Sequence, residues 1–224
     1  MNANQTKLQP KLQPKLQPKM KKIGIIGFSS FTREILCNLK RNFDIFVSES
    51  IYTSLPVETI AKDYKCNIIK LHQFDTSRYD ALVTIANAKV RADIVNQLPI
   101  RTEYYTYIDK RSIMMDKNIA IGKGSIICAG SILTTNVKLG KFTQINLNTT
   151  IGHDTIVGDY FTCAPGANIS GNCCIGHNVY IGTNATIKEK IQICDDVVIG
   201  MNSGVVKNIM ASGTYIGTPC KKIS

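Results

Sequence analysis

The chain has 224 residues, of which 44% are hydrophobic, so it is long enough for two small domains with apolar cores. We find no apolar run that would span a bilayer and no signal peptide, so we expect a cytoplasmic protein without membrane insertion. The net charge is +11, but six lysines in the first 22 residues account for more than half of it and leave +5 for the rest of the chain. We therefore expect no nucleic-acid partner.

Residues 7–18 are three copies of Lys-Leu-Gln-Pro. Proline at every fourth residue prevents a helix, and the repeat forms no apolar face. We predict that residues 1–19 are a disordered extension and that the folded sequence begins at Met20. Binding of this extension to a membrane or a nucleic acid stays an alternative, although no basic–aromatic motif accompanies it.

Strands and helices alternate over residues 20–98. Strands are predicted at 22–27, 44–47, 67–71 and 81–85, and helices at 33–42, 57–65 and 89–98. This order is typical of a doubly wound parallel sheet, so we predict a small Rossmann-like domain of about four strands. The first strand ends at Gly27, and the turn that follows is a candidate phosphate site beside a helix N-terminus. The turn lacks the GxGxxG spacing, so a nicotinamide dinucleotide is not expected, and a turn with only a packing role is the alternative.

After a predicted connector at 99–118, residues 119–206 carry a strict six-residue repeat. Apolar residues occupy every sixth position, at Ile121, Ile127, Leu133, Leu139, Ile145, Ile151, Val157, Cys163, Ile169, Ile175, Ile181, Ile187, Ile193, Ile199 and Val205. This period fits neither an α-helix nor an amphipathic strand and is typical of a solenoid. Three faces close a coil of eighteen residues, so we predict about five coils of a left-handed parallel β-helix. Residues 207–224 are the predicted C-terminal tail, folded back over the last coil.

The glycines and the cysteines of the chain lead to two further predictions. Glycine follows the apolar residue in many repeats, and we expect it to supply unusual φ angles at the corners. The eight cysteines show no zinc-like spacing, and Cys163 and Cys173 fall on inward repeat positions. We interpret the cysteines as small buried hydrophobic residues in a reducing compartment.

The chain has three histidines, and two of them stand at the same place in the repeat. His153 lies in Ile-Gly-His-Asp and His177 in Ile-Gly-His-Asn. They are 24 residues apart, one coil plus one face, so we expect them at different corners. His153 is the better candidate for a general base because Asp154 could orient its ring, and an imidazole with an ordinary pKa of about 6.5 can accept a proton from an amine or hydroxyl. A solvent-exposed corner histidine is the alternative, and the interpretation we favour for His177. We expect His72 to be structural or on the surface.

The repeat region resembles the sugar acetyltransferases of the NeuD/PglD type. The resemblance is carried by Ile145-Asn146, Ile151-Gly152-His153-Asp154, Val157-Gly158-Asp159, Ala164-Pro165-Gly166 and Ile169-Ser170-Gly171. The Ile-Ile-Gly turn, the segment 84–87 with Arg91, and Gly217-Thr218-Pro219 are similar as well. The resemblance covers about residues 20–224.

This resemblance implies a homotrimer with active sites between neighbouring β-helices. It implies acetyl-CoA as the donor, and the reaction expected from it needs no metal. The implied acceptor is the amino group of a nucleotide-linked 4-amino-4,6-dideoxy sugar, held by the N-terminal domain. The acetyl group would pass directly from the thioester to the amine, with His153 as the general base.

The resemblance also implies a set of site residues. Asp154 would assist His153, Asn146 would place the acceptor amine, and the Gly171 N–H would polarise the thioester carbonyl. The implied substrate contacts are Asn146, Gly27, Ser29, Ser30, Glu49 and Asn87. The implied acetyl-CoA contacts are Thr162, Gly171 and Gly182.

The chain departs from the family in three places. Thr162 stands where many members have a second histidine, and a hydroxyl can donate a hydrogen bond but cannot replace an imidazole. The turn 27–32 differs from the family's glycine-rich turn, which leaves the acceptor open. Asp109 and Lys110 follow Ile108 where the family usually has His-Pro.

Three other functions remain as alternatives. The same base would serve O-acetylation of a sugar such as sialic acid. A trimeric module without catalysis is the second alternative. A γ-type carbonic anhydrase would need three histidine ligands on zinc, and the repeats offer two at the wrong separation.

Overall fold

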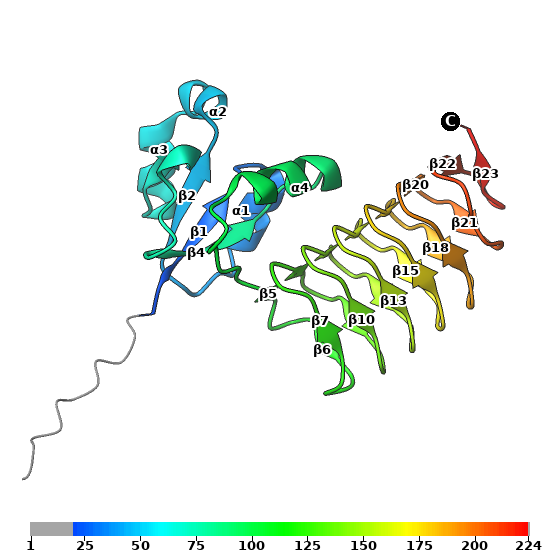
Figure 1. The fold of residues 1–224 in the computed structure, drawn as a ribbon. Helices are drawn as coiled ribbons and strands as arrows, with labels where there is room; N and C mark the ends of the chain where they lie inside the picture. The colour runs from blue at the N-terminus through cyan, green and yellow to red at the C-terminus, as the bar shows by residue number, and fades with distance from the viewer. Residues whose placement is uncertain (1–19, 224) are drawn as a thin grey trace, which may run out of the picture.

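The computed structural model describes residues 20–223, which form an α/β domain followed by a long prism of stacked coils (Figure 1). The extension expected at residues 1–19 lies outside the described residues. No helix formed by residues 20–223 combines the length and the hydropathy that crossing a membrane requires.

The N-terminal domain contains four parallel strands in the order β3-β2-β1-β4. The strands are β1 (Lys22–Ile26), β2 (Phe43–Val47), β3 (Ile68–Lys70) and β4 (Tyr79–Val83). The helices are α1 (Ser30–Leu36), α2 (Glu49–Ser54), α3 (Val57–Tyr64) and α4 (Ala88–Gln97), with the 3₁₀ turn η1 at Leu71–Gln73. Residues of α1 and α3 pack on one face of the sheet, and residues of α4 and η1 pack on the other.

The observed elements differ from the sequence prediction in several places: α1 ends at Leu36 instead of residue 42, and β4 lies two residues before the predicted strand 81–85. Helix α1 begins at Ser30, three residues before the predicted start, because the Ser29 hydroxyl accepts a hydrogen bond from the Thr32 N–H at 3.3 Å and caps the helix there. Helix α2 was not predicted. It buries no side chain, so its sequence carries no amphipathic pattern that would reveal it.

The prism has three flat faces, each a parallel sheet of short strands one coil apart. The first face contains β5 (Tyr107–Ile108), β8 (Ile126–Ile127), β11 (Gln144–Ile145), β14 (Thr162–Cys163), β17 (Tyr180–Ile181), β20 (Val197–Ile199) and β22 (Gly213–Ile216). The second face contains β6 (Ile113–Met114), β9 (Ile132–Leu133), β12 (Thr150–Ile151), β15 (Asn168–Ile169), β18 (Thr186–Ile187) and β21 (Gly204–Val205). The third face contains β7 (Ala120–Ile121), β10 (Lys138–Leu139), β13 (Ile156–Val157), β16 (Cys174–Ile175) and β19 (Gln192–Ile193).

We name the corners by the faces they follow: the first corner follows the first face, and the second and third corners follow the second and third faces. Pairing of Gln144 with Thr162 shows the register, because partners on adjacent coils are eighteen residues apart. The predicted six-residue period is confirmed. Fourteen of the fifteen repeat positions are buried, and Ile121 of an early coil is partly buried against them.

The φ angles at the corners show that our expectation about glycine was wrong. The left-handed φ angles fall three residues after the apolar position, mostly on asparagine and aspartate, as at Asn136 and Asp154. Glycines directly after the apolar residue, such as Gly122, do not have positive φ. They are needed because adjacent coils approach closely: a Cβ at Gly122 would lie 2.4 Å from the Gly140 carbonyl carbon.

The cysteine expectation holds in part. Cys163 and Cys173 are buried in the prism, as predicted, whereas Cys37 and Cys174 are exposed. All eight are free thiols.

The prism begins and ends with segments that the repeat pattern does not mark. Strands β5 and β6 lie in the predicted connector, yet they already pair with β8 and β9. At the other end β22 pairs with β20, and β23 (Lys221–Lys222) returns antiparallel to β22. These strands cover the open ends of the apolar column.

The N-terminal domain docks on the first face. The Gln144 side chain of β11 donates from Nε2 to the carbonyls of Val83 and Ile85, at 3.2 and 3.1 Å. Tyr107 and Ile126 of the first face belong to the same apolar cluster as α1 and α3. The two parts therefore share a core.

Candidate functional site

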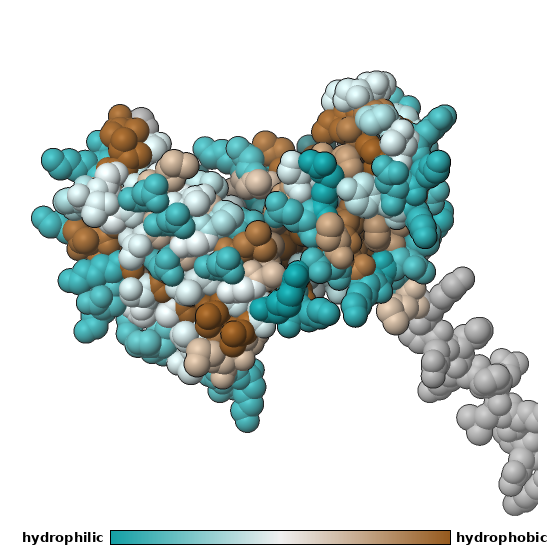
Figure 2. Space-filling model, turned by 180° about the vertical axis from the view of Figure 1, so that it is seen from behind, coloured by the Kyte–Doolittle hydropathy of each residue, from teal (hydrophilic) through white to brown (hydrophobic). Residues whose placement is uncertain are grey.

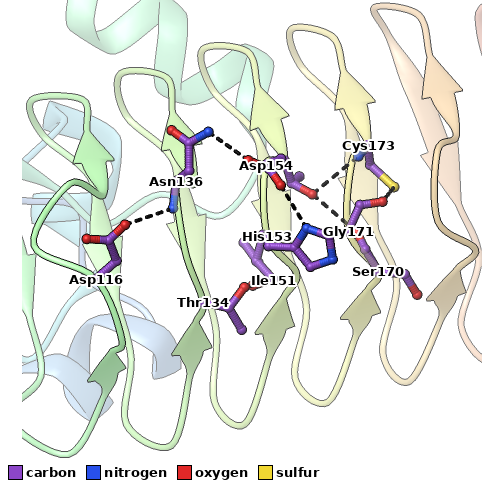
Figure 3. Close-up of polar contacts among 10 residues, drawn as sticks. Asp116, Thr134, Asn136, Ile151, His153, Asp154, Ser170, Gly171 and Cys173 are labelled. Atoms are coloured by element: carbon purple, nitrogen blue, oxygen red, sulfur yellow. Dashed lines mark hydrogen bonds and ion pairs between the residues drawn. The ribbon is translucent and has the colours of Figure 1, made fainter.

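His153 lies at the second corner, two residues after β12. Its ring points along the corner toward the next coil (Figure 3). The next residue, Asp154, has a φ of 58°, and this turn brings its carboxylate back to the ring: His153 Nδ1 lies 2.8 Å from Asp154 Oδ2. The side chains of both residues are about half exposed, so solutes can reach the pair.

The other carboxylate oxygen of Asp154 is also bonded. Asn136, one coil earlier, donates from Nδ2 to Asp154 Oδ1 at 2.7 Å. The hydrogen bonds from Asn136 and then His153 hold the pKa of Asp154 below its ordinary value, so the carboxylate is ionised at neutral pH. An ionised carboxylate only accepts, which places the proton of neutral His153 on Nδ1 and leaves the Nε2 lone pair free.

Gly171, one coil after His153, lies next to this free nitrogen. A Cβ on Gly171 would lie 2.6 Å from His153 Nε2, so the ring occupies the space that a side chain would fill. Among residues 20–223, the Gly171 N–H donates to no acceptor. A free lone pair therefore lies beside a glycine whose backbone N–H has no acceptor, and such an arrangement suits proton removal next to a developing oxyanion.

His177 lies at the third corner, so the prediction that the two histidines occupy different corners is confirmed. Its ring Nδ1 accepts a hydrogen bond from the Asp159 backbone N–H at 3.0 Å. Its backbone N–H donates to Asp195 Oδ1 at 2.7 Å. These bonds join three coils along the corner. The ring of His177 therefore has a structural partner where that of His153 has a carboxylate.

The remaining residues predicted on the prism do not gather around His153 within one chain. Asn146 and Gly182 lie at the first corner, on a different edge. Asn146 donates from Nδ2 to the Cys163 carbonyl at 2.9 Å. Gly182 is buried, and a Cβ there would lie 2.6 Å from the Met201 nitrogen.

Thr162 is 2% exposed and lies beneath the N-terminal domain. Its hydroxyl accepts a hydrogen bond from Arg91 Nη2 at 2.9 Å.

Arg91 of α4 is fully buried and also donates to the Ile85 and Tyr160 carbonyls. Its burial lowers the pKa of the guanidinium to about 10, which still leaves it charged at neutral pH. Arg91 thus fixes the end of β4 against the prism. The sequence does not reveal this contact of Arg91, because the contact depends on how the domains dock.

The residues predicted in the N-terminal domain come together at the carboxyl edge of its sheet. Gly27 follows β1 with a φ of 100°, a conformation that favours glycine. Ser29 caps α1, and the Ser30 hydroxyl accepts from Arg33 Nη2 at 3.1 Å. Asn87 follows β4 and caps α4 by accepting from the Val90 N–H. Strand order changes direction between β1 and β4, where ligands bind in open α/β sheets.

Glu49 follows β2 at the same edge. Its Oε1 lies 2.6 Å from Lys70 Nζ. Beside it is a hollow of about 360 Å³, also lined by Ser48, His72 and Phe74. His72 therefore stands near a predicted substrate contact and not in the core.

Asn136 is the residue that sequence reasoning missed. Its spacing carried a signal: it stands eighteen residues before Asp154, which is one coil. No group of three or more His, Cys, Asp or Glu within residues 20–223 is arranged to hold a metal ion.

Comparisons with known proteins place these features in context. No protein-family model matches the sequence. GDP-perosamine N-acetyltransferase of Escherichia coli O157:H7 is 30% identical over 179 residues, which are 77% of this chain and 80% of that protein. WeeI from Acinetobacter baumannii AYE superposes with a TM-score of 0.78 at 27% identity and covers 91% of this chain and all of that one.

A third relative shares the fold at lower identity. The acetyltransferase domain of PglB from Neisseria gonorrhoeae FA1090, solved in complex with acetyl coenzyme A, superposes with a TM-score of 0.78 at 20% identity. It covers 91% of this chain and 99% of that domain. Because of the match to the E. coli enzyme and the prism of stacked coils, the chain belongs to the acyltransferase family of sugar N-acetyltransferases built on a left-handed β-helix of hexapeptide repeats.

Proposed function

We propose that this protein transfers the acetyl group of acetyl-CoA to the amino group of a nucleotide-linked 4-amino-4,6-dideoxy sugar. The observation that carries the proposal is the second corner. There the Asp154-bonded imidazole of His153 presents a free Nε2 next to Gly171, whose backbone N–H has no acceptor among the described residues. Membership of a sugar N-acetyltransferase family supports both the acetyl donor and the amine acceptor.

In the proposed reaction the neutral sugar amine attacks the thioester carbonyl carbon. As the C–N bond forms, His153 Nε2 takes a proton from the amine nitrogen, and Asp154 stabilises the resulting imidazolium. The Gly171 N–H donates a hydrogen bond to the carbonyl oxygen while it carries negative charge. The tetrahedral intermediate then collapses, the C–S bond breaks, and the leaving thiolate of CoA receives the proton from His153.

We place the acceptor's nucleotide at the carboxyl edge of the N-terminal sheet. The turn from Gly27 to Ser30 would face the phosphates, and Glu49 and Asn87 would flank the nucleoside and sugar. The relative from E. coli is a GDP-perosamine N-acetyltransferase. GDP-perosamine is therefore the first acceptor to test, ahead of sugars linked to UDP or dTDP. We propose that the reaction takes place in the cytoplasm.

We also propose a homotrimer with sites between neighbouring prisms. One chain does not bring Asn146 to His153, because they lie on different edges, so a shared site needs a second copy. Apolar side chains such as Ile156 and Met201 stand exposed on the prism, and Figure 2 shows hydrophobic patches there among polar residues. Light scattering of the purified protein tests the trimer by its mass.

The function is tested by following thiol release from acetyl-CoA with GDP-perosamine, with UDP- and dTDP-linked 4-amino-4,6-dideoxy sugars, and with free sialic acid. We expect release that requires an amino sugar and a product heavier by one acetyl group on nitrogen. His153→Ala is the control. Release with sialic acid alone would replace the proposal with O-acetylation. Binding of CoA without release from any acceptor would favour a module without catalysis.

A further inference from the structure

We propose that Asn136 is a positioning residue for the catalytic base, acting on His153 through the carboxylate of Asp154. This inference rests on the proposed function, in which His153 accepts the proton. It assigns to Asn136 the task of holding the carboxylate so that His153 keeps its proton on Nδ1 and its lone pair on Nε2.

The second corner carries a continuous series of contacts over three coils (Figure 3). Asp116 Oδ2 accepts a hydrogen bond from the Asn136 N–H at 3.3 Å. The Asn136 side chain donates to Asp154 Oδ1 at 2.7 Å, and Asp154 Oδ2 lies 2.8 Å from His153 Nδ1. The series ends at the ring, whose far side rests on Gly171.

The bond from Asn136 matters because Asp154 is exposed. A carboxylate with a 46% exposed side chain can rotate and bond to water, and a single bond to a mobile ring would not prevent it. Asn136 holds one oxygen, which leaves the other oxygen directed at Nδ1. The same bond is the largest influence that keeps the pKa of Asp154 low, so it also keeps the acceptor ionised.

The chain contains a matched contact without a histidine. At the third corner, Asn178 donates from Nδ2 to Asp196 Oδ1 at 3.4 Å, again one coil apart. Asn136 and Asn178 both have left-handed φ angles, 52° and 56°. Within the described residues the Asp196 carboxylate forms no hydrogen bond with an imidazole, so substitution of Asn178 removes a similar bond without the effect on His153.

The first experiment compares Asn136→Gly with Asn178→Gly, since glycine accepts the left-handed φ and removes only the side-chain donor. Imidazole nitrogen NMR of the full-length protein, without substrates, reports the tautomer of His153. We expect the Nδ1–H tautomer in the wild type and in Asn178→Gly, and a mixture of tautomers in Asn136→Gly. Unchanged tautomer populations in Asn136→Gly would overturn the inference whether or not an acceptor has been found.

The second readout is kinetic. With GDP-perosamine or whichever acceptor proves active, we expect Asn136→Gly to lower kcat on the order of tenfold at unchanged KM, because the base is misplaced while the binding surfaces persist. Asn178→Gly should keep the wild-type kcat. Equal losses in the two variants, in step with equal losses in thermal stability, would reduce Asn136 to a structural role.

Asn136→Asp supplies an independent measurement. The new carboxylate would face Asp154 and favour the imidazolium form, so the acidic limb of the rate profile should move to higher pH. Asn178→Asp should leave that limb in place. A profile unchanged in Asn136→Asp would contradict the proposed coupling.

Discussion

The second and third corners of the prism carry the same Ile-Gly-His sequence and use it differently. At the second corner His153 has a carboxylate on Nδ1 and an open Nε2 above Gly171. At the third corner His177 Nδ1 accepts from the Asp159 backbone, and Asp195 accepts from the His177 backbone. The first ring is poised for proton transfer, and the second joins coils.

The difference comes from the residue one coil further along. Eighteen residues after His153 stands Gly171, which leaves space for the ring and has no side chain to accept from the corner N–H. Eighteen residues after His177 stands Asp195, whose carboxylate closes the corner. In a solenoid the repeat position fixes the backbone, and the stacked neighbour decides the chemistry.

Removing each ring should give the largest contrast. His153→Ala should lower kcat on the order of 10²- to 10⁴-fold, because the proposed general base is lost. His177→Ala should stay within a few-fold of the wild-type kcat. Steady-state kinetics on both purified variants check this. Equal losses would mean that the two corners are not functionally distinct.

Exchanging the carboxylate tests the orientation of the ring. Asp154→Asn keeps the size and tolerates the left-handed φ, but its amide no longer enforces the Nδ1–H tautomer. We expect kcat to fall on the order of 10- to 100-fold. The acidic limb of the pH profile should move to lower pH, because the imidazolium loses its adjacent charge. Asp195→Asn at the other corner serves as the control and should leave the profile unchanged.

Adding one methyl group at each corner separates activity from stability. In Gly171→Ala the new Cβ would meet the end of the His153 ring, which can move aside, so activity should fall steeply while the melting temperature changes little. In Gly158→Ala the Cβ would lie 2.7 Å from the His177 backbone nitrogen, which cannot move alone. We expect a loss of about 1–3 kcal/mol in unfolding free energy there. A loss of stability at unchanged activity in Gly171→Ala, together with a loss of activity at unchanged stability in Gly158→Ala, would refute this assignment.

The smallest expected effect is the loss of the closing hydrogen bond at the third corner. Asp195→Ala removes the acceptor of the His177 N–H at an exposed site. The cost should be about 1 kcal/mol in unfolding free energy, seen by denaturant titration. A fall in kcat would show that this corner takes part in the reaction.

The prism was predictable because its six-residue period is visible in the sequence. One apolar residue every six positions defines the faces, and a coil of eighteen residues defines which side chains stack. The separation of 24 residues was enough to place His153 and His177 at different corners. The adjacency of His153 to Asp154 likewise followed from their order in the chain.

The contacts between the domains were not predictable in this way. Burial of Thr162 depends on Arg91 reaching across from α4, and no local pattern reports that approach. The expectation about glycine was wrong because both positive φ angles and close approach of coils favour glycine. The sequence does not distinguish these two causes. The contact from Asn136 to Asp154 could have been found by applying the coil spacing to polar residues as well as apolar ones.

The most direct test of the account is an amide NMR titration of the isotope-labelled protein with acetyl-CoA. We predict that the Gly171 amide resonance shifts on binding, because its N–H is free to donate, while the Asp159 amide bonded to His177 does not. A shift at Asp159 with none at Gly171 would contradict the assignment of the second corner as the reactive one.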